Sequence, residues 1–161
     1  QGVLNAVAEL MPHGVHVTVL LIDIDEMAGR YVKRIATQSS IPNVEFRQGD
    51  IFRFESLIAD FKPDIIEMLG FLDYLKDPLA IRMIRRIKKR LMPNGFFFTC
   101  HIHDNLERDF LYNVVNWGRD AHMLYRTAEE LDELVERGGF SERLIITEPH
   151  GIHSILRAKV Q

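Results

Sequence analysis

The chain has 161 residues, of which 47% are hydrophobic and 27% charged, as is typical of a globular protein with one packed core. Its net charge of -3 and its pI of about 6.2 exclude a general attraction to nucleic acid or to anionic membranes. Cys100 is the single cysteine, and neither a signal-peptide pattern nor a membrane-length apolar run occurs. These features predict a cytoplasmic protein without a membrane partner.

Amphipathic segments of helical length alternate along the chain with short apolar runs. Helices are expected over Gly2–Met11, Glu26–Gln38, Phe52–Phe61, Pro78–Met92, Leu106–Trp117 and Ala128–Arg137. Strands are expected over Val15–Ile22, Val44–Gln48, Ile65–Leu69, Phe96–Ile102, Arg143–Thr147 and His153–Lys159. Thr127 is a good N-cap for the last helix, and Glu130 completes a capping box.

This alternation predicts an α/β fold with a doubly wound, mostly parallel sheet and right-handed crossovers. The last two strands have only the segment 148–151 between them, and a short turn joins only antiparallel neighbours. The sheet is therefore expected to end in a C-terminal antiparallel hairpin. No linker or internal repeat is found, so residues 1–161 are interpreted as a single domain.

Acidic residues follow the first two strands that are expected in this chain. In sheets of this kind, ligands bind beyond the carboxyl ends of the strands. Asp23 could accept hydrogen bonds from both hydroxyls of a ribose, and Asp25 either shares this role or caps the next helix. Asp50 could accept from an adenine amino group, with Ile51 packed on the ring. The alternative for Asp50 is a turn aspartate that binds its own backbone.

Five segments resemble, in their order and spacing, successive motifs of class I S-adenosylmethionine-dependent methyltransferases. They are VTVLLIDIDE, VEFRQGDIF, PDIIEMLGFLDYL, LMPNGFFFTCHI and TAEELDELVERGGF, and they cover nearly the whole chain. The resemblance implies a Rossmann-like fold and S-adenosyl-L-methionine as cofactor. By the same resemblance Asp23, with Ile24 and Asp25 beside it, would hold the ribose, Asp50 and Ile51 the adenine, and Met68, Leu69 and Gly70 the methionine side.

The resemblance also implies a first strand and a glycine-rich loop before the first helix, whereas this chain opens directly on that helix. Gly2 stands where the last loop glycine is expected, and it is included among the cofactor-binding candidates. The missing strand would lie centrally, and each backbone group left unpaired costs about 1–3 kcal/mol. We therefore expect the natural protein to extend upstream, and the sheet of these residues alone to be damaged or completed by another segment.

Methyl transfer mainly requires alignment of nucleophile and methyl group, and a base is needed only where the acceptor loses a proton. The candidates for such a base are Asp73, His101 and His103, while a hydrogen-bonded structural or a solvated role is the favoured interpretation of the two histidines. His101 and His103 with Asp104 offer too few ligands for a structural metal, so no metal site is expected. Substrate contacts are expected from Tyr74, Trp117, Tyr125 and Arg126, the last with an anionic group, while the aromatic residues could equally be packing residues.

The function implied is methyl transfer to a small-molecule acceptor by an enzyme that does not bind nucleic acid. The basic run 82–90 has apolar residues at helical spacing, which indicates the solvated side of an amphipathic helix. The Asn/Asp-Pro-Pro-aromatic signature of DNA amino-methyltransferases is replaced by the sequence Glu67 to Gly70. Two alternatives stay open: a nicotinamide-dependent oxidoreductase, and a non-catalytic Rossmann-like binding or scaffold module.

Overall fold

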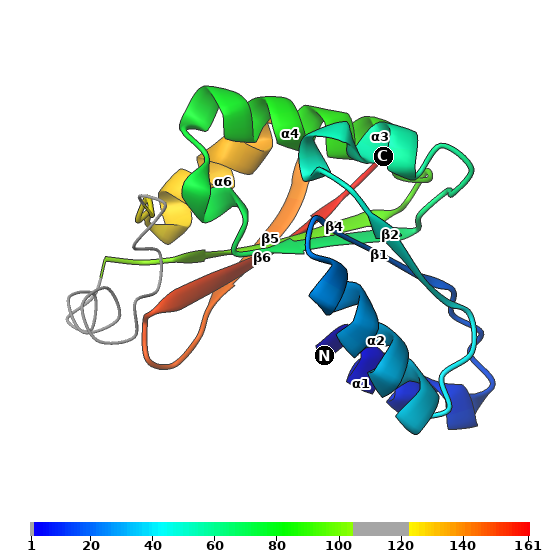
Figure 1. The fold of residues 1–161 in the computed structure, drawn as a ribbon. Coiled ribbons are helices and arrows are strands. Elements are labelled where there is room, and N and C mark those ends of the chain that lie inside the picture. Colours follow the sequence, from blue (N-terminus) through cyan, green and yellow to red (C-terminus); the bar gives the residue numbers. More distant parts are fainter. Residues whose placement is uncertain (1, 105–122) are drawn as a thin grey trace. The chain divides into compact units, whose positions relative to one another are not determined.

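The computed structural model describes residues 2–104 and 123–161. The chain forms two compact units, one in the first 60 residues and one from Phe61 to Gln161 (Figure 1). The helix predicted over 106–117, and with it the substrate candidate Trp117, lies outside the described residues. None of the helices in the described part of the chain has the length and apolar character that a membrane crossing requires.

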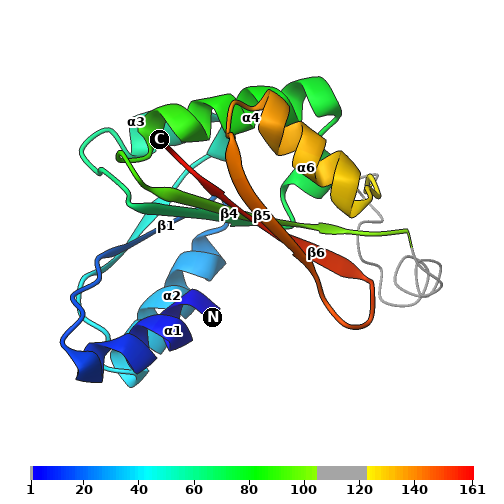
Figure 2. The same cartoon turned by 180° about the vertical axis from the view of Figure 1, so that it is seen from behind.

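The first unit packs two helices on a pair of parallel strands. Its elements are α1 (Gly2–Leu10), η1 (Met11–His13), β1 (Val19–Asp23), α2 (Glu26–Gln38), β2 (Val44–Gln48), η2 (Ile51–Arg53) and α3 (Phe54–Leu57). Figures 1 and 2 show α1 and α2 side by side. Leu4 and Val7 of α1 are buried with Val19 of β1 and with Ile41, which precedes β2. Helix α2 passes so close to β2 that a Cβ on Gly29 would lie 2.4 Å from the Phe46 ring.

Two of the predicted elements in this unit are shorter than expected. Strand β1 begins at Val19, not at Val15, because Val19 pairs with Val44 and β2 has no earlier residue to pair with the chain before Val19. The helix expected over 52–61 is reduced to η2 and the single turn α3. There the Arg47 guanidinium donates a hydrogen bond to the carbonyl oxygen of Leu57. In a longer helix this oxygen would accept from a backbone N–H instead.

The second unit is a four-stranded sheet with the strand order β3-β4-β6-β5. Its elements are β3 (Ile65–Leu69), η3 (Leu72–Tyr74), α4 (Asp77–Arg90), β4 (Phe96–Ile102), α6 (Ala128–Arg137), β5 (Glu142–Thr147) and β6 (His153–Lys159). β3 and β4 are parallel, whereas β6 runs antiparallel to both β4 and β5. This confirms the predicted terminal hairpin. Helices α4 and α6 cover one face of the sheet (Figure 2), where Phe97, Leu156 and Leu131 are fully buried.

Two basic side chains of the run 82–90 form hydrogen bonds with carbonyl oxygens at the C-terminal end of α6. Arg85 donates two hydrogen bonds, of 3.1 and 3.2 Å, to the carbonyl oxygen of Arg137, and Lys88 donates to that of Gly139. The helices meet closely, since a Cβ on Gly138 would lie 2.2 Å from the side chain of Ile84. Part of the positive charge of α4 therefore serves the C-terminal end of α6, where exposed carbonyl groups favour cations.

The parallel strands form two sheets instead of one. In the described part of the chain, β1 pairs only with β2, and β3 with β4 but not with β1. The single sheet that was expected is therefore divided into a two-stranded and a four-stranded sheet in this part of the chain. The α/β class, the parallel pairs and the closing hairpin are as predicted.

The capping box of α6 provides a test of local stability. Thr127 Oγ1 accepts a hydrogen bond of 3.2 Å from the Glu130 N–H, and Glu130 Oε2 accepts one of 2.8 Å from the Thr127 N–H. Thr127→Ala is expected to lower the free energy of unfolding by about 1 kcal/mol, because the first turn of α6 loses an acceptor. Urea unfolding measures this, and Thr127→Ser, which retains the hydroxyl, should lose clearly less. Equal losses in both variants would show that the Thr127 hydroxyl does not stabilise α6 as an N-cap.

Candidate functional site

Asp23 and Asp50 stand at the carboxyl ends of two neighbouring parallel strands. Asp23 is the last residue of β1 and lies opposite Gln48, the last residue of β2, while Asp50 follows β2 after Gly49. The Gly49 N–H donates a hydrogen bond of 2.9 Å to the carbonyl oxygen of Asp23, which ties the two strand ends together. The structure thus places both predicted acids at one edge of the first unit.

Each of these carboxylates uses only one oxygen within the part of the chain that the structure describes. Asp23 Oδ1 accepts from the Asp25 N–H at 2.9 Å, and Asp50 Oδ1 accepts from the Phe52 N–H at 2.8 Å. The other oxygen, Oδ2, of both residues accepts no hydrogen bond from the residues that the structure describes, and both side chains are exposed. The turn interpretation of Asp50 is therefore correct for one oxygen, and the second oxygen remains available to a ligand.

The other candidates in this unit occupy distinct positions. Asp25 caps α2, because its Oδ1 accepts a hydrogen bond of 2.8 Å from the Met27 N–H. Helix capping was the second of the two roles predicted for Asp25. Ile24 is 71% exposed beside Asp23. Ile51 is half-buried, and Gly2 lies exposed at the start of α1. Adenosine has hydroxyl and amino donors and a flat ring, so it requires hydrogen-bond acceptors such as these carboxylates next to exposed apolar surface.

The candidates Met68, Leu69 and Gly70 lie in the second unit, at the end of β3. Met68 is buried, whereas Leu69 is 52% exposed. Gly70 has φ +73°, a left-handed conformation that glycine adopts without strain, and among the described residues other than its chain neighbours the nearest atom to an added Cβ is Asp73 Oδ2, at 3.9 Å. The strand therefore ends in a tight turn with open space beside it.

A buried polar cluster lies behind this turn. His101 on β4 is completely buried, and Asp73 in η3 is 3% exposed. Asp73 Oδ1 lies 2.9 Å from Nδ1 of His101, yet it accepts no well-aligned hydrogen bond from the described residues. The carbonyl oxygen of Ile102, 3.3 Å from Nδ1, is the better-aligned acceptor. Two base candidates are thus brought together, but both are enclosed.

Arg126 joins this cluster instead of standing in an open pocket. Its guanidinium donates to the carbonyl oxygens of Leu72 at 3.1 Å and Leu75 at 2.6 Å, and to Asp77 at 2.8 and 3.1 Å. It also contacts Nε2 of His101. With 6% of its surface exposed, Arg126 fixes the segment that follows β3, and its contact with an anionic substrate stays a prediction. Asp77 was not singled out by sequence reasoning, since only its place before Pro78 marked it as a helix start.

His103, the third base candidate, is half-buried at the end of β4. Its Nε2 lies 2.7 Å from Oγ of the buried Ser154, which lies 2.7 Å from Oγ1 of Thr147. Ser154 of the β5–β6 hairpin therefore contacts the histidine directly, and Thr147 contacts Ser154. Among residues 2–104 and 123–161, no group of three or more metal-ligating side chains is found.

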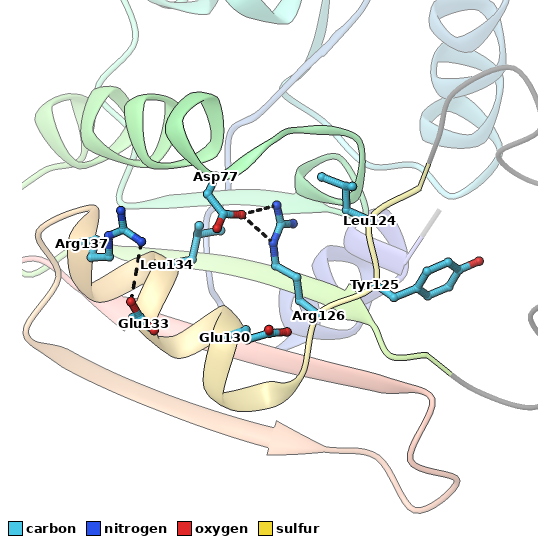
Figure 3. Close-up of a pocket in the computed structure, with 8 residues that line it drawn as sticks. All are labelled: Asp77, Leu124, Tyr125, Arg126, Glu130, Glu133, Leu134 and Arg137. Carbon is cyan, nitrogen blue, oxygen red and sulfur yellow. Dashed lines mark hydrogen bonds and ion pairs between the residues drawn. The ribbon is translucent and has the colours of Figure 1, made fainter.

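A cavity of about 310 Å³ lies in the second unit, over α6 and the residues before it (Figure 3). Asp77 pairs there with Arg126, and Glu133 with Arg137 at 3.6 Å. Figure 3 shows the half-buried Tyr125 pointing away from the Arg126 guanidinium. Tyr74 is half-buried in η3 and does not line this cavity. Of the three substrate candidates that the structure describes, Tyr125 and Arg126 line this cavity and Tyr74 does not.

Two further side chains near the end of β3 have a raised pKa. Burial raises the pKa of the Glu67 carboxyl and that of the Cys100 thiol, and Cys100 is paired with Leu69 in the parallel register. A raised pKa lowers the thiolate fraction of a cysteine and so makes it a weaker nucleophile.

Comparison with solved structures gives many chains of the same fold. Human N-acetylserotonin methyltransferase in complex with SAM has a TM-score of 0.56 and 17% identity over 88% of this chain and 47% of its own. An O-methyltransferase family 2 protein from Planctomyces limnophilus, in complex with apigenin, has a TM-score of 0.68 and 14% identity over 89% and 44%. N,N-8-amino-8-demethyl-D-riboflavin dimethyltransferase from Streptomyces davawensis has a TM-score of 0.63 and 22% identity over 89% and 42%.

The chain spans about half the length of the solved structures that it matches, from 42% to 53% in these and in an exported protein of Bordetella parapertussis. No curated protein matches the sequence. The family model described as a methyltransferase domain matches residues 3–139 and so runs through both units. The chain belongs to this methyltransferase domain family.

Proposed function

We propose that the protein transfers a methyl group from S-adenosylmethionine to a small-molecule acceptor. The observation that carries the proposal is the pair Asp23 and Asp50. Both are exposed on neighbouring parallel strands, and each has one oxygen left for a ligand. Asp23 would accept from the ribose hydroxyls and Asp50 from the adenine amino group. We further propose that both units are parts of one domain.

When bound, S-adenosylmethionine supplies an electrophilic methyl group on a sulfonium. The chain's own contribution in the first unit is to hold the adenosine through Asp23 and Asp50. Alignment of this kind can supply about 7–11 kcal/mol of the barrier. Where the acceptor must lose a proton, His103 is the candidate with access to solvent, since His101 is fully buried.

Two observations support a small acceptor over nucleic acid. Two basic side chains of α4 already have hydrogen-bond partners within the second unit, because Arg85 and Lys88 donate to carbonyl oxygens at the end of α6. The structurally similar proteins from Streptomyces and Planctomyces are described with a riboflavin derivative and with apigenin, both small ring compounds. We therefore place the acceptor among small molecules.

Calorimetry of the full-length protein tests the cofactor proposal directly. S-adenosylhomocysteine is expected to bind saturably at one site, and NADH should give no heat of binding under the same conditions. Binding of NADH alone would instead favour a nicotinamide-dependent oxidoreductase. Binding of neither nucleotide would favour a scaffold that has lost its cofactor.

A further inference from the structure

Strand β5 lies at one edge of the four-stranded sheet of the second unit. The strand order β3-β4-β6-β5 gives β5 a partner on one side, and within residues 2–104 and 123–161 no strand pairs with its other side. The outer side of an edge strand presents a row of N–H and C=O groups that can pair with a strand of another chain. The edge of β5 is therefore a candidate interaction surface that lies within a single unit.

The side chains of β5 do not protect this edge in the usual ways. Proteins block edge strands with charged side chains, with proline or with β-bulges. β5 contains no proline, and its pairing with β6 is regular along the whole strand. Arg143 is the only basic residue of β5, and its guanidinium donates hydrogen bonds of 2.8 and 3.0 Å to Asp132 of α6. Glu142, the only acid of β5, stands at its first position, so the middle of the edge is apolar.

Three large apolar side chains lie exposed next to this edge. Leu144 and Ile146 of β5 are 47% and 60% exposed, and Ile155 of β6, which is paired with Ile146, is 49% exposed. Successive side chains of a strand point to opposite faces, and Arg143 points to α6. Leu144 and Ile146 therefore lie on the face of the sheet opposite α4 and α6. Burial of such apolar surface favours association with a partner.

The pattern of these side chains is complementary to itself. In an antiparallel pair of two β5 strands centred on Ile145, Leu144 of one copy would lie opposite Ile146 of the other, and two-fold symmetry makes this contact twice. Ile155 of each copy extends the contact, because it is paired with Ile146 within its own sheet. The exposed apolar side chains of two copies would thus form one continuous strip, which an unrelated strand would not provide.

We propose that two copies of the chain associate through antiparallel pairing of their β5 strands, with Ile145 opposite Ile145 of the other copy. This register places Arg143 opposite the uncharged Thr147, so no like charges lie opposite each other within residues 143–147. Because Ile145 then lies opposite itself, α6 of both copies lies on the same face of one continuous sheet. The inference does not depend on the proposed function.

Sedimentation equilibrium of the full-length protein measures the association. The wild type is expected to form a dimer. Ile146→Lys should raise the dissociation constant of the dimer about tenfold or more, because it places a charge in the apolar strip. Leu79→Lys is the matched control, since Leu79 is a 49% exposed residue of α4 in the same unit, and it should leave the dissociation constant unchanged. Melting curves show whether each variant is folded.

Disulfide formation tests the register of the two strands. The background is a full-length protein whose cysteines, Cys100 among them, are replaced by serine. Residues directly opposite each other in an antiparallel pair have Cβ atoms about 4.5–5.5 Å apart, so Ile145→Cys should give a covalent dimer on mild oxidation. Thr147→Cys should give none, because the two copies of this residue would lie about 13 Å apart along the strands.

Several results would overturn the inference. They are a wild type that stays monomeric, a dimer that Ile146→Lys and Leu79→Lys weaken equally, and a covalent dimer that forms through Thr147→Cys but not through Ile145→Cys. If Ile146→Lys does not fold, the covalent dimer of Ile145→Cys decides the question alone, because isoleucine to cysteine is a mild change at a half-buried position.

Discussion

Arg126→Met is expected to lower the free energy of unfolding by about 3–5 kcal/mol, because the guanidinium makes two buried hydrogen bonds to carbonyl oxygens and each bond to a charged group contributes about 1.5–3 kcal/mol. Arg126 is 6% exposed and donates to two carbonyl oxygens, a carboxylate and an imidazole. Methionine fills similar volume but supplies no donor. The carbonyl groups of Leu72 and Leu75 would then be left without this partner in the interior.

Urea unfolding monitored by circular dichroism measures this loss. Arg82→Met is the matched control, because Arg82 is an exposed arginine of α4 in the same unit and the same change there should cost little. Arg126→Lys should lie between the two, since a lysine keeps the charge but cannot reach all four partners with one planar group. A variant Arg126→Met as stable as Arg82→Met would show that the network contributes nothing to stability.

The second large effect concerns ligand affinity. Asp23→Asn and Asp50→Asn retain the side-chain oxygen that accepts the local backbone hydrogen bond, so each turn should persist. Each replaces the free oxygen with an amide donor, which opposes the hydroxyl or amino donors of adenosine. Hydrogen bonds to charged groups contribute about 1.5–3 kcal/mol, so each variant should bind S-adenosylhomocysteine about 10–100-fold more weakly.

Calorimetry measures both variants and the double variant, with melting curves to show that the fold is retained. Glu9→Gln removes one exposed negative charge from α1 in the same unit and controls for net charge. If both acids contact one adenosine, the double variant should show no measurable binding. Wild-type affinity in both single variants would remove the main support for the proposed function.

Much of the fold could be predicted from the sequence, because the signals are local. The bounds of α2, β2, β3, β4, α6 and β6 agree with the predicted segments, as does the capping box at Thr127. Helical spacing, runs of β-branched residues and capping side chains act over a few residues. The predicted start of β1 was wrong because a strand begins only where its partner does, and that depends on β2. The length of α3 likewise depends on Arg47, which donates a hydrogen bond to the carbonyl oxygen of Leu57, ten residues later in the chain.

At the candidate site, the sequence by itself determined that acids follow two successive strands, and parallel pairing then placed Asp23 and Asp50 at one edge. Only the tertiary structure decided the roles of Arg126, His101 and Asp73. Arg126 reaches partners 25 to 54 residues away, and no spacing pattern encodes such contacts. Whether a charged side chain is exposed or buried depends on which distant atoms surround it, and those are brought together only when the sheet and helices pack.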